Sequence, residues 1–390
     1  MSNENNNINN NNNINNNNND TNSLNTSSNN NSNSHNETTN ELNITKADSI
    51  DSDFPTSGFF TLIFKDGSEF TGEMDKGEIN NFGILKSSNG EIFEGEFNIQ
   101  NKTNPNETIK GKLKFDKGTY EGEFKNFKFD GLGILKYKNG DIYTGNFKNG
   151  LKEGEGKLNF FEGDVYEGNF SKNKIEGEGK LTISNISLYK GNFINGLYDG
   201  YGILTSLQKN ETLIGYFKNG LIDGEGIHYK DNGDVYDGHF SKGKFNGNGK
   251  YTFKDQTYYE GNFKDGNFNG EGTLTFENGD KYVGNFNNGI REGKGIFYFG
   301  NGGVYEGEFK NNLFDGSGIL YKENGDIIEG NFDKGFLKGK AVYYPQDGIP
   351  YDIDTEEWIN KNNNLLIFVL FFICVNIFLN FLLINYFLLK

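Results

Sequence analysis

The chain has 390 residues, with 54 glycines, 4 prolines, 37 phenylalanines, 21 tyrosines and a formal net charge of −16. Many glycines beside many aromatic residues are typical of short strands joined by tight turns. Residues 1–57, 58–344 and 345–390 carry net charges of −6, −7 and −3. No segment has the basic excess of a nucleic-acid-binding protein, so that function class is disfavoured.

The N-terminal segment is rich in asparagine, with 22 in residues 1–40. Such a tract buries too little apolar surface to offset its ordering entropy, so we interpret residues 1–57 as a disordered arm. A neutral low-complexity expansion and a recruiting or aggregation-prone role both fit this composition. The segment has no basic region followed by an apolar one, so we expect no secretory signal peptide.

A pentad of aromatic-x-Gly-x-aromatic type recurs from FTGEM at 70–74 to IEGNF at 328–332. The starts of successive pentads are 23 residues apart in nine of eleven cases. A fixed period of 20–50 residues indicates a repeat architecture. The signature residues of the eight best-formed units are Tyr120, Gly122, Phe124, Tyr143, Gly145, Phe147, Tyr166, Gly168, Phe170, Tyr189, Gly191, Phe193, Tyr236, Gly238, Phe240, Tyr259, Gly261, Phe263, Tyr282, Gly284, Phe286, Tyr305, Gly307 and Phe309.

Each unit is predicted to contain two amphipathic strands. Alternation places Tyr166, Gly168 and Phe170 on one face of a strand. A Gly-x-Gly element follows, as at Gly177 and Gly179, and starts a second strand. The glycines leave space for an aromatic ring to lie flat over the sheet. One hairpin is unstable alone, so neighbouring units must stack.

Asn-Gly pairs stand between one unit and the next and predict two-residue hairpin turns, because both residues accept positive φ. They are Asn139-Gly140, Asn232-Gly233, Asn278-Gly279 and Asn324-Gly325. The predicted fold class is an all-β repeat, an elongated single-layer array of antiparallel β-hairpins, plus one C-terminal transmembrane helix. About 24 strands at roughly 4.8 Å each give a rod of about 115 Å before twist.

The unit YEGNF at 166–170 with Gly177-Glu178-Gly179 resembles the MORN repeat (membrane occupation and recognition nexus). The resemblance covers residues 58–344 as about twelve repeats. Departures from the pattern are four extra residues around 101–106, a non-aromatic first residue at Leu213 and Ile328, and an incomplete last unit after Gly339.

Residues 365–389, from Leu365 to Leu389, carry no charged side chain. As a helix they would extend about 37 Å, against about 30 Å of hydrocarbon in a bilayer. We predict a transmembrane helix, after a linker at 345–364, although a helix buried in a soluble domain is the alternative. The layout predicts a tail-anchored, single-pass protein of an intracellular membrane, with its repeats facing the cytosol.

The sequence offers no recognised chemical site. Cys374 is the only cysteine, which excludes a disulfide framework or a cysteine zinc site within the chain. His35, His228 and His239 fall in no ligand motif, and the Gly-x-Gly pairs lack the third glycine of a dinucleotide loop. The calcium-loop resemblance of residues 231–234 is explained by hairpin geometry. We expect no catalytic residue, cofactor or metal, and hence no enzyme.

Two functions fit these observations. Repeats of this family with a C-terminal span resemble the junctophilins, which implies a scaffold or membrane-contact tether whose repeats meet phospholipid or a membrane-bound protein. The alternative is a protein-binding adaptor, with exposed aromatic residues forming a groove. Monomers and homodimers are both compatible with the repeats.

A row of lysines on one set of loops would favour lipid binding. Lysine follows the pentad phenylalanine in several units, at Lys148, Lys172, Lys218, Lys242, Lys264 and Lys310. Acidic residues recur nearby, so the pattern favours neither function. They are Glu153, Glu176, Asp223, Asp265 and Asp315.

Overall fold

The computed structural model describes residues 57–75, 78–97 and 108–355. Residues 1–56 of the predicted arm, the four extra residues around 101–106 and the predicted helix 365–389 lie outside these ranges, whereas Ser57, the last residue of the predicted arm, begins a strand. Within them, all elements are β-strands, and no helix is both long and apolar enough to cross a membrane.

The described residues fall into two units, one ending at Tyr198 and one beginning at Asp199. The first contains β1 (Ser57–Ile63), β2 (Glu69–Asp75), β3 (Glu78–Lys86), β4 (Ile92–Glu96), β5 (Ile109–Phe115), β6 (Gly118–Lys125), β7 (Lys128–Tyr137), β8 (Ile142–Lys148), β9 (Leu151–Asn159), β10 (Val165–Ser171), β11 (Lys174–Ile183) and β12 (Ser187–Ile194). The unit boundary falls within β13 (Leu197–Ser206).

The second unit continues with β14 (Glu211–Lys218), β15 (Leu221–Tyr229), β16 (Val235–Ser241), β17 (Lys244–Thr252), β18 (Tyr258–Lys264), β19 (Asn267–Thr275), β20 (Lys281–Asn287), β21 (Ile290–Tyr298), β22 (Val304–Lys310), β23 (Leu313–Tyr321), β24 (Ile327–Asp333), β25 (Phe336–Tyr344) and β26 (Tyr351–Asp354). The sheet therefore extends beyond residue 344, because Ile353 of β26 packs with Ile328 and Ala341.

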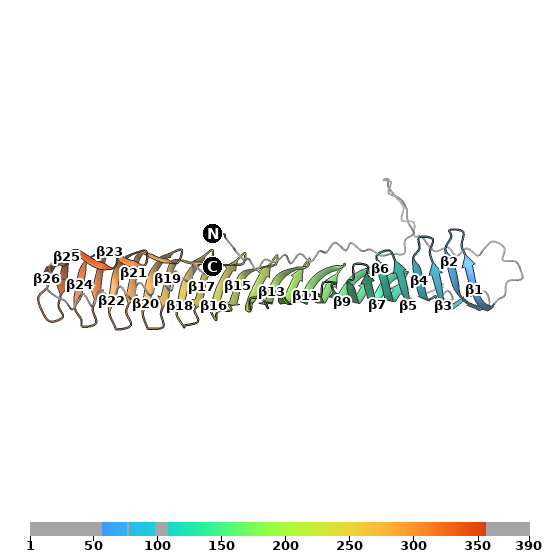
Figure 1. Cartoon of the computed structure of the whole chain (residues 1–390), viewed down its shortest axis with the longest axis horizontal. Coiled ribbons are helices and arrows are strands. Elements are labelled where there is room, and N and C mark those ends of the chain that lie inside the picture. The colour runs from blue at the N-terminus through green and yellow to red at the C-terminus, as the bar shows by residue number, and fades with distance from the viewer. Residues whose placement is uncertain (1–56, 76–77, 98–107, 356–390) are drawn as a thin grey trace, which may run out of the picture. The chain divides into compact units, whose positions relative to one another are not determined.

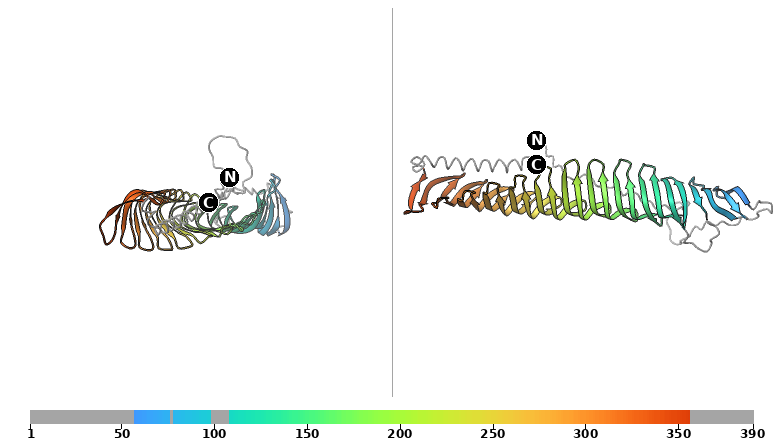
Figure 2. Two further views of the ribbon diagram at one scale, coloured as in Figure 1. Left: turned by 60° about the vertical axis from the view of Figure 1, so that its left-hand side comes forward. Right: turned by 90° about the horizontal axis from the view of Figure 1, so that it is seen from below.

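Within each unit, every strand pairs antiparallel with the next strand along the chain (Figure 1). Other views show the same succession of adjacent strands (Figure 2). The predicted antiparallel hairpins are confirmed. Contacts are concentrated between consecutive strands, so each unit is one layer with two faces.

The strand register places glycines opposite glycines. Gly168 of β10 faces Gly156 on one side and Gly179 on the other. An irregularity follows in the pairing with β11, where Phe170 faces Ile175, so that the three residues 176–178 of β11 stand opposite Asn169 alone. Because the surplus on β11 is two residues, Ile175 stays on the same buried face as Leu181, while the strand turns more sharply.

The Asn-Gly pairs lie in hairpin turns, as predicted, but these turns are wider than two residues. At Asn139-Gly140 only the glycine has positive φ, and Asn139 instead bonds Asp141 through its side chain. The two-residue turns lie on the other edge of the sheet, between the two strands of each 23-residue repeat. Asn149 and Gly150 there have φ values of 51° and 85° and connect β8 directly to β9. The asparagine side chain stabilises the wider turn, and a rule based on the Asn-Gly dipeptide alone does not take this hydrogen bond into account.

Candidate binding face

The signature tyrosines form the core of the array. All eight are completely buried, and the signature phenylalanines are nearly so. The centroid of the Tyr143 ring lies 5.0 Å from that of Phe147 and 4.9 Å from that of Phe170 in the next repeat, both edge-on. The same contact recurs from one repeat to the next, so the aromatic residues join the hairpins. The signature aromatics are therefore not among the exposed aromatic residues that the adaptor alternative requires.

The glycines of the signature make room for these rings. A Cβ on Gly156 would lie 2.4 Å from the Tyr143 hydroxyl oxygen, so no other residue fits beneath the ring. The hydroxyl donates a hydrogen bond to the backbone carbonyl of Asn146 at 2.9 Å. The expectation that glycine leaves space for a flat ring is confirmed.

Burial changes the acidity of these tyrosines. Removal from water raises the pKa of the Tyr282 hydroxyl to about 12, although the Arg291 cation partly opposes the shift. The pKa values of Tyr143 and Tyr166 are also raised, again mainly by burial. The tyrosines therefore stay neutral at physiological pH and act as packing groups.

The opposite face of the sheet is open and hollowed. A groove of about 1030 Å³ crosses β18 to β24, all within the second unit. Paired glycines such as Gly284 and Gly295 lie along its floor. A Cβ on either glycine would point to the other face, toward the Tyr282 ring, so the groove is walled by the residues between the glycines, such as Val283 and Ile296.

Acidic and aliphatic side chains line this groove. Its half-buried aliphatic residues are Val283, Ile296 and Ile319. Lys294, opposite Glu308 in the strand register, is the one basic residue of the lining. The exposed carboxylates are those of Glu260, Glu271, Glu306, Glu308 and Glu329. This chemistry suits an apolar segment that carries positive charge.

Most of the acids that recur near the lysine row have a structural role. The Glu153 carboxylate accepts a hydrogen bond from the backbone N–H of Lys172 in the next turn, at 2.9 Å. Asp223 accepts one from the backbone of Lys242 in the same way. The equivalent bonds of Glu176 and Asp315 are made to Asn195 and Lys334. The lysine side chains of the row are exposed, and the carboxylates of Glu153 and Asp223 bind the backbone of two of these lysines.

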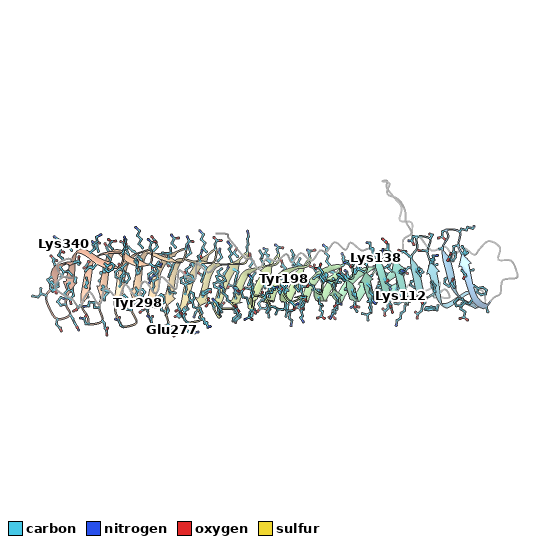
Figure 3. All side chains as sticks on the ribbon, viewed as in Figure 1. Lys112, Lys138, Tyr198, Glu277, Tyr298 and Lys340 are labelled. Atoms are coloured by element: carbon cyan, nitrogen blue, oxygen red, sulfur yellow. The ribbon has the colours of Figure 1, made fainter. Side chains whose placement is uncertain are left out.

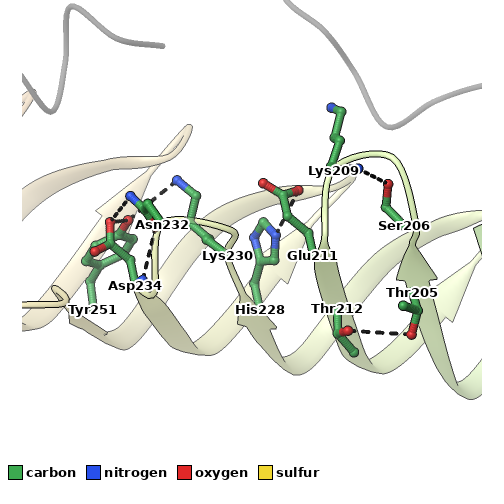
Figure 4. Close-up of polar contacts among 10 residues, drawn as sticks. All are labelled: Thr205, Ser206, Lys209, Glu211, Thr212, His228, Lys230, Asn232, Asp234 and Tyr251. Carbon is green, nitrogen blue, oxygen red and sulfur yellow. Dashed lines mark hydrogen bonds and ion pairs between the residues drawn. The ribbon is translucent and has the colours of Figure 1, made fainter.

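His228 and His239, the two histidines in the described ranges, do not share a site. The His228 ring lies 3.4 Å from the Glu211 carboxylate, whose pKa is lowered first by this hydrogen bond (Figure 4). The His239 ring instead contacts the carbonyl of Asn246. In the part of the chain that the structure describes, no group of histidine, cysteine and acidic side chains is arranged to hold a metal ion.

The loop at 231–234 also uses its acids structurally. One Asp234 oxygen accepts hydrogen bonds from the Asn232 amide at 2.8 Å and the Tyr251 hydroxyl at 2.7 Å (Figure 4). The other accepts the backbone N–H of Lys254. Both Asp234 oxygens therefore accept hydrogen bonds that hold the hairpin turn.

Sequence reasoning missed two buried cations. Lys152 and Arg291 occupy the position nine residues after the signature tyrosine. In other repeats this position holds a phenylalanine, such as Phe129 or Phe268, that stacks on the tyrosine ring. Arg291 is 0% exposed and lies 5.5 Å from the Tyr282 ring. The sequence does contain a signal for them, because each is a basic residue at a position of the 23-residue period where other repeats have an apolar residue.

A family model for the MORN repeat matches nine segments of the chain, which together cover about half of it. They are residues 120–142, 143–165, 166–185, 189–206, 214–235, 236–258, 259–281, 282–304 and 305–327. The chain belongs to the MORN-repeat family. Six of the matches are 23 residues long, and eight of the nine contain the signature residues derived from the sequence.

No curated protein matches this MORN-repeat chain. Among solved structures, similarity is found to the SAS-4 (dCPAP) TCP domain of Drosophila melanogaster, in complex with a proline-rich motif of Ana2 (dSTIL), at 14% identity and a TM-score of 0.16. That alignment covers 50% of this chain and 81% of the other. Virginiamycin B lyase from Staphylococcus aureus is 10% identical with a TM-score of 0.12, covering 77% and 85%. TM-scores this low carry no argument about function.

Proposed function

We propose that this protein is a non-enzymatic MORN-repeat scaffold that recruits a protein partner in the groove on its open face. The observation that carries the proposal is the groove across β18 to β24, floored by glycine pairs and lined by aliphatic and acidic side chains. Tyrosine rings pack against the back of this floor, as Tyr282 does at Gly284 and Gly295. A preformed surface reduces the entropy lost on binding.

The scaffold is proposed to be held on an intracellular membrane by residues 365–389, with the repeats in the cytosol. The support is the uncharged, apolar composition of that segment. Membrane attachment would concentrate the groove at a surface, so that a weak partner binds more strongly. In the tether version of this function, the partner belongs to a second membrane.

The adaptor component is tested by site-specific photo-crosslinking in cells. A photoreactive amino acid is placed at Ser317 in the groove, and in a matched variant at Asn301, an exposed turn residue outside it. We expect protein adducts from the groove position and few from the turn. Equal adducts at the two positions, or none at Ser317, would refute recruitment by the groove.

A further inference from the structure

The open face carries a second feature, over β13 to β15. Tyr201 and Tyr216 are 54% and 53% exposed, and their rings lie 5.5 Å apart. Ile203, Ile214 and Ile227 are direct neighbours across the three strands. We call these five residues the apolar pad. All belong to the second unit, as does the groove.

The repeat pattern does not require this pad. The positions of Tyr201 and Ile203 are occupied by Glu178 and Lys180 in the preceding hairpin, and by Asn248 and Lys250 two hairpins later. Both alternatives are exposed and compatible with the same strand register. A contiguous group of large apolar side chains on the surface is typical of an interaction site.

Resting on the proposed function, we propose that the pad and the groove bind one continuous segment of a partner protein. The partner's aromatic or aliphatic residues contact the pad, and its lysine or arginine residues face the groove. Charge complementarity identifies this occupant, because five glutamates and one lysine line the groove. A nucleic acid or an acidic peptide would be repelled by the same carboxylates.

The spacing of the two features sets the length of the segment. The middle of the pad is at β14 and the middle of the groove is at β21, seven strands further along the sheet. At about 4.8 Å per strand this separation is about 34 Å. A helix of about 22 residues spans it.

The test uses the full chain in detergent and a displayed library of random 24-residue peptides. We expect the enriched peptides to be basic, with an aromatic or branched aliphatic cluster. The affinities of synthesised peptides are then measured at low salt. The double substitution Glu306→Lys with Glu308→Lys should weaken binding about 10-fold or more. The matched pair Glu277→Lys with Glu323→Lys, outside the groove, should change affinity less than about 2-fold.

The pad is tested in parallel. Tyr201→Ser with Tyr216→Ser should weaken the same peptides about 10-fold, whereas Tyr298→Ser, an exposed tyrosine outside the pad, should not (Figure 3). Thermal melting of each variant separates loss of binding from loss of folding.

Enrichment of neutral or acidic peptides, or basic peptides insensitive to these substitutions, would overturn the inference. If groove crosslinks at Ser317 persist in that case, the proposed function stands with a partner of different chemistry. If neither the peptides nor the crosslinker engage this face, both proposals fail.

Discussion

At the scale of single residues, the two buried cations show how the repeat tolerates an exception. Each is followed 21 residues later by an asparagine in place of the usual turn glycine, at Asn173 and Asn312. The asparagine side chain accepts the backbone N–H of Lys152 in one case and of Arg291 in the other, both at 2.8 Å. The two positions change together, so the substitution is a coupled one.

Replacing Arg291 with phenylalanine should stabilise the array. The guanidinium Nε and Nη1 have no hydrogen-bond partner among the described residues, and burial lowers the Arg291 pKa to about 10. Phenylalanine at the equivalent Phe268 stacks on its tyrosine at 3.9 Å. We expect Arg291→Phe to raise the free energy of unfolding by about 1–3 kcal/mol in urea denaturation. Arg291→Ala, which leaves a cavity, is the control, and a lower midpoint for Arg291→Phe would contradict the argument.

The buried tyrosines predict cooperative unfolding in alkali. Their folded-state pKa values are raised above the ordinary value of 10.0, to about 12 for Tyr282. The stability that they contribute is fully present below pH 10 and is lost as pH rises through the folded-state values. We expect tyrosinate absorbance and loss of the β-sheet circular dichroism signal to rise together above about pH 10. Ionisation of most tyrosines with the sheet intact would show that the rings are accessible.

At the scale of elements, the sequence predicted the hairpins and the aromatic face because both follow from a period of two. It predicted two-residue turns at the Asn-Gly pairs between repeats, whereas those turns lie on the other edge of the sheet. Asn139-Gly140 and Asn149-Gly150 are the same dipeptide, and only Asp141 beside the first selects the wider turn. It also did not reveal that Glu153 serves the turn of the next unit, because that bond joins residues 19 apart. Such bonds depend on how hairpins stack.

Two glycines in one strand should respond differently to alanine. A Cβ on Gly179 would lie 2.4 Å from the Tyr166 hydroxyl oxygen, whereas the nearest atom to one on Gly177 is 3.6 Å away. Gly177 has a φ of 76°, so alanine there causes backbone strain alone. We expect Gly179→Ala to cost about 3 kcal/mol and Gly177→Ala about 1–2 kcal/mol in chemical denaturation. The reverse order would mean that the ring relaxes freely.

At the scale of the whole molecule, the predicted anchor sets the topology. If residues 365–389 span the membrane with the repeats in the cytosol, the sequons Asn169-Phe170-Ser171 and Asn210-Glu211-Thr212 never meet the glycosylation machinery. We expect no glycan at either site and digestion of the repeats by protease added to intact microsomes. A version without residues 365–390 should remain soluble. Glycan at either site would place the repeats in a lumen.

The last prediction separates recruitment of a protein from direct contact with lipid. The groove lining has five carboxylates and one ammonium group, and acids such as Glu153 and Asp223 lie beside the lysine row. An anionic leaflet should therefore repel the open face and gain little from the lysine edge. We expect the chain without residues 365–390 not to float with neutral or anionic liposomes at low salt. The full chain, reconstituted in the same liposomes, is the positive control.

Flotation of the truncated chain with anionic liposomes alone would assign the lysine row to lipid binding. Flotation with both kinds would instead point to insertion of the apolar pad, and either result would favour the tether that touches a second membrane directly.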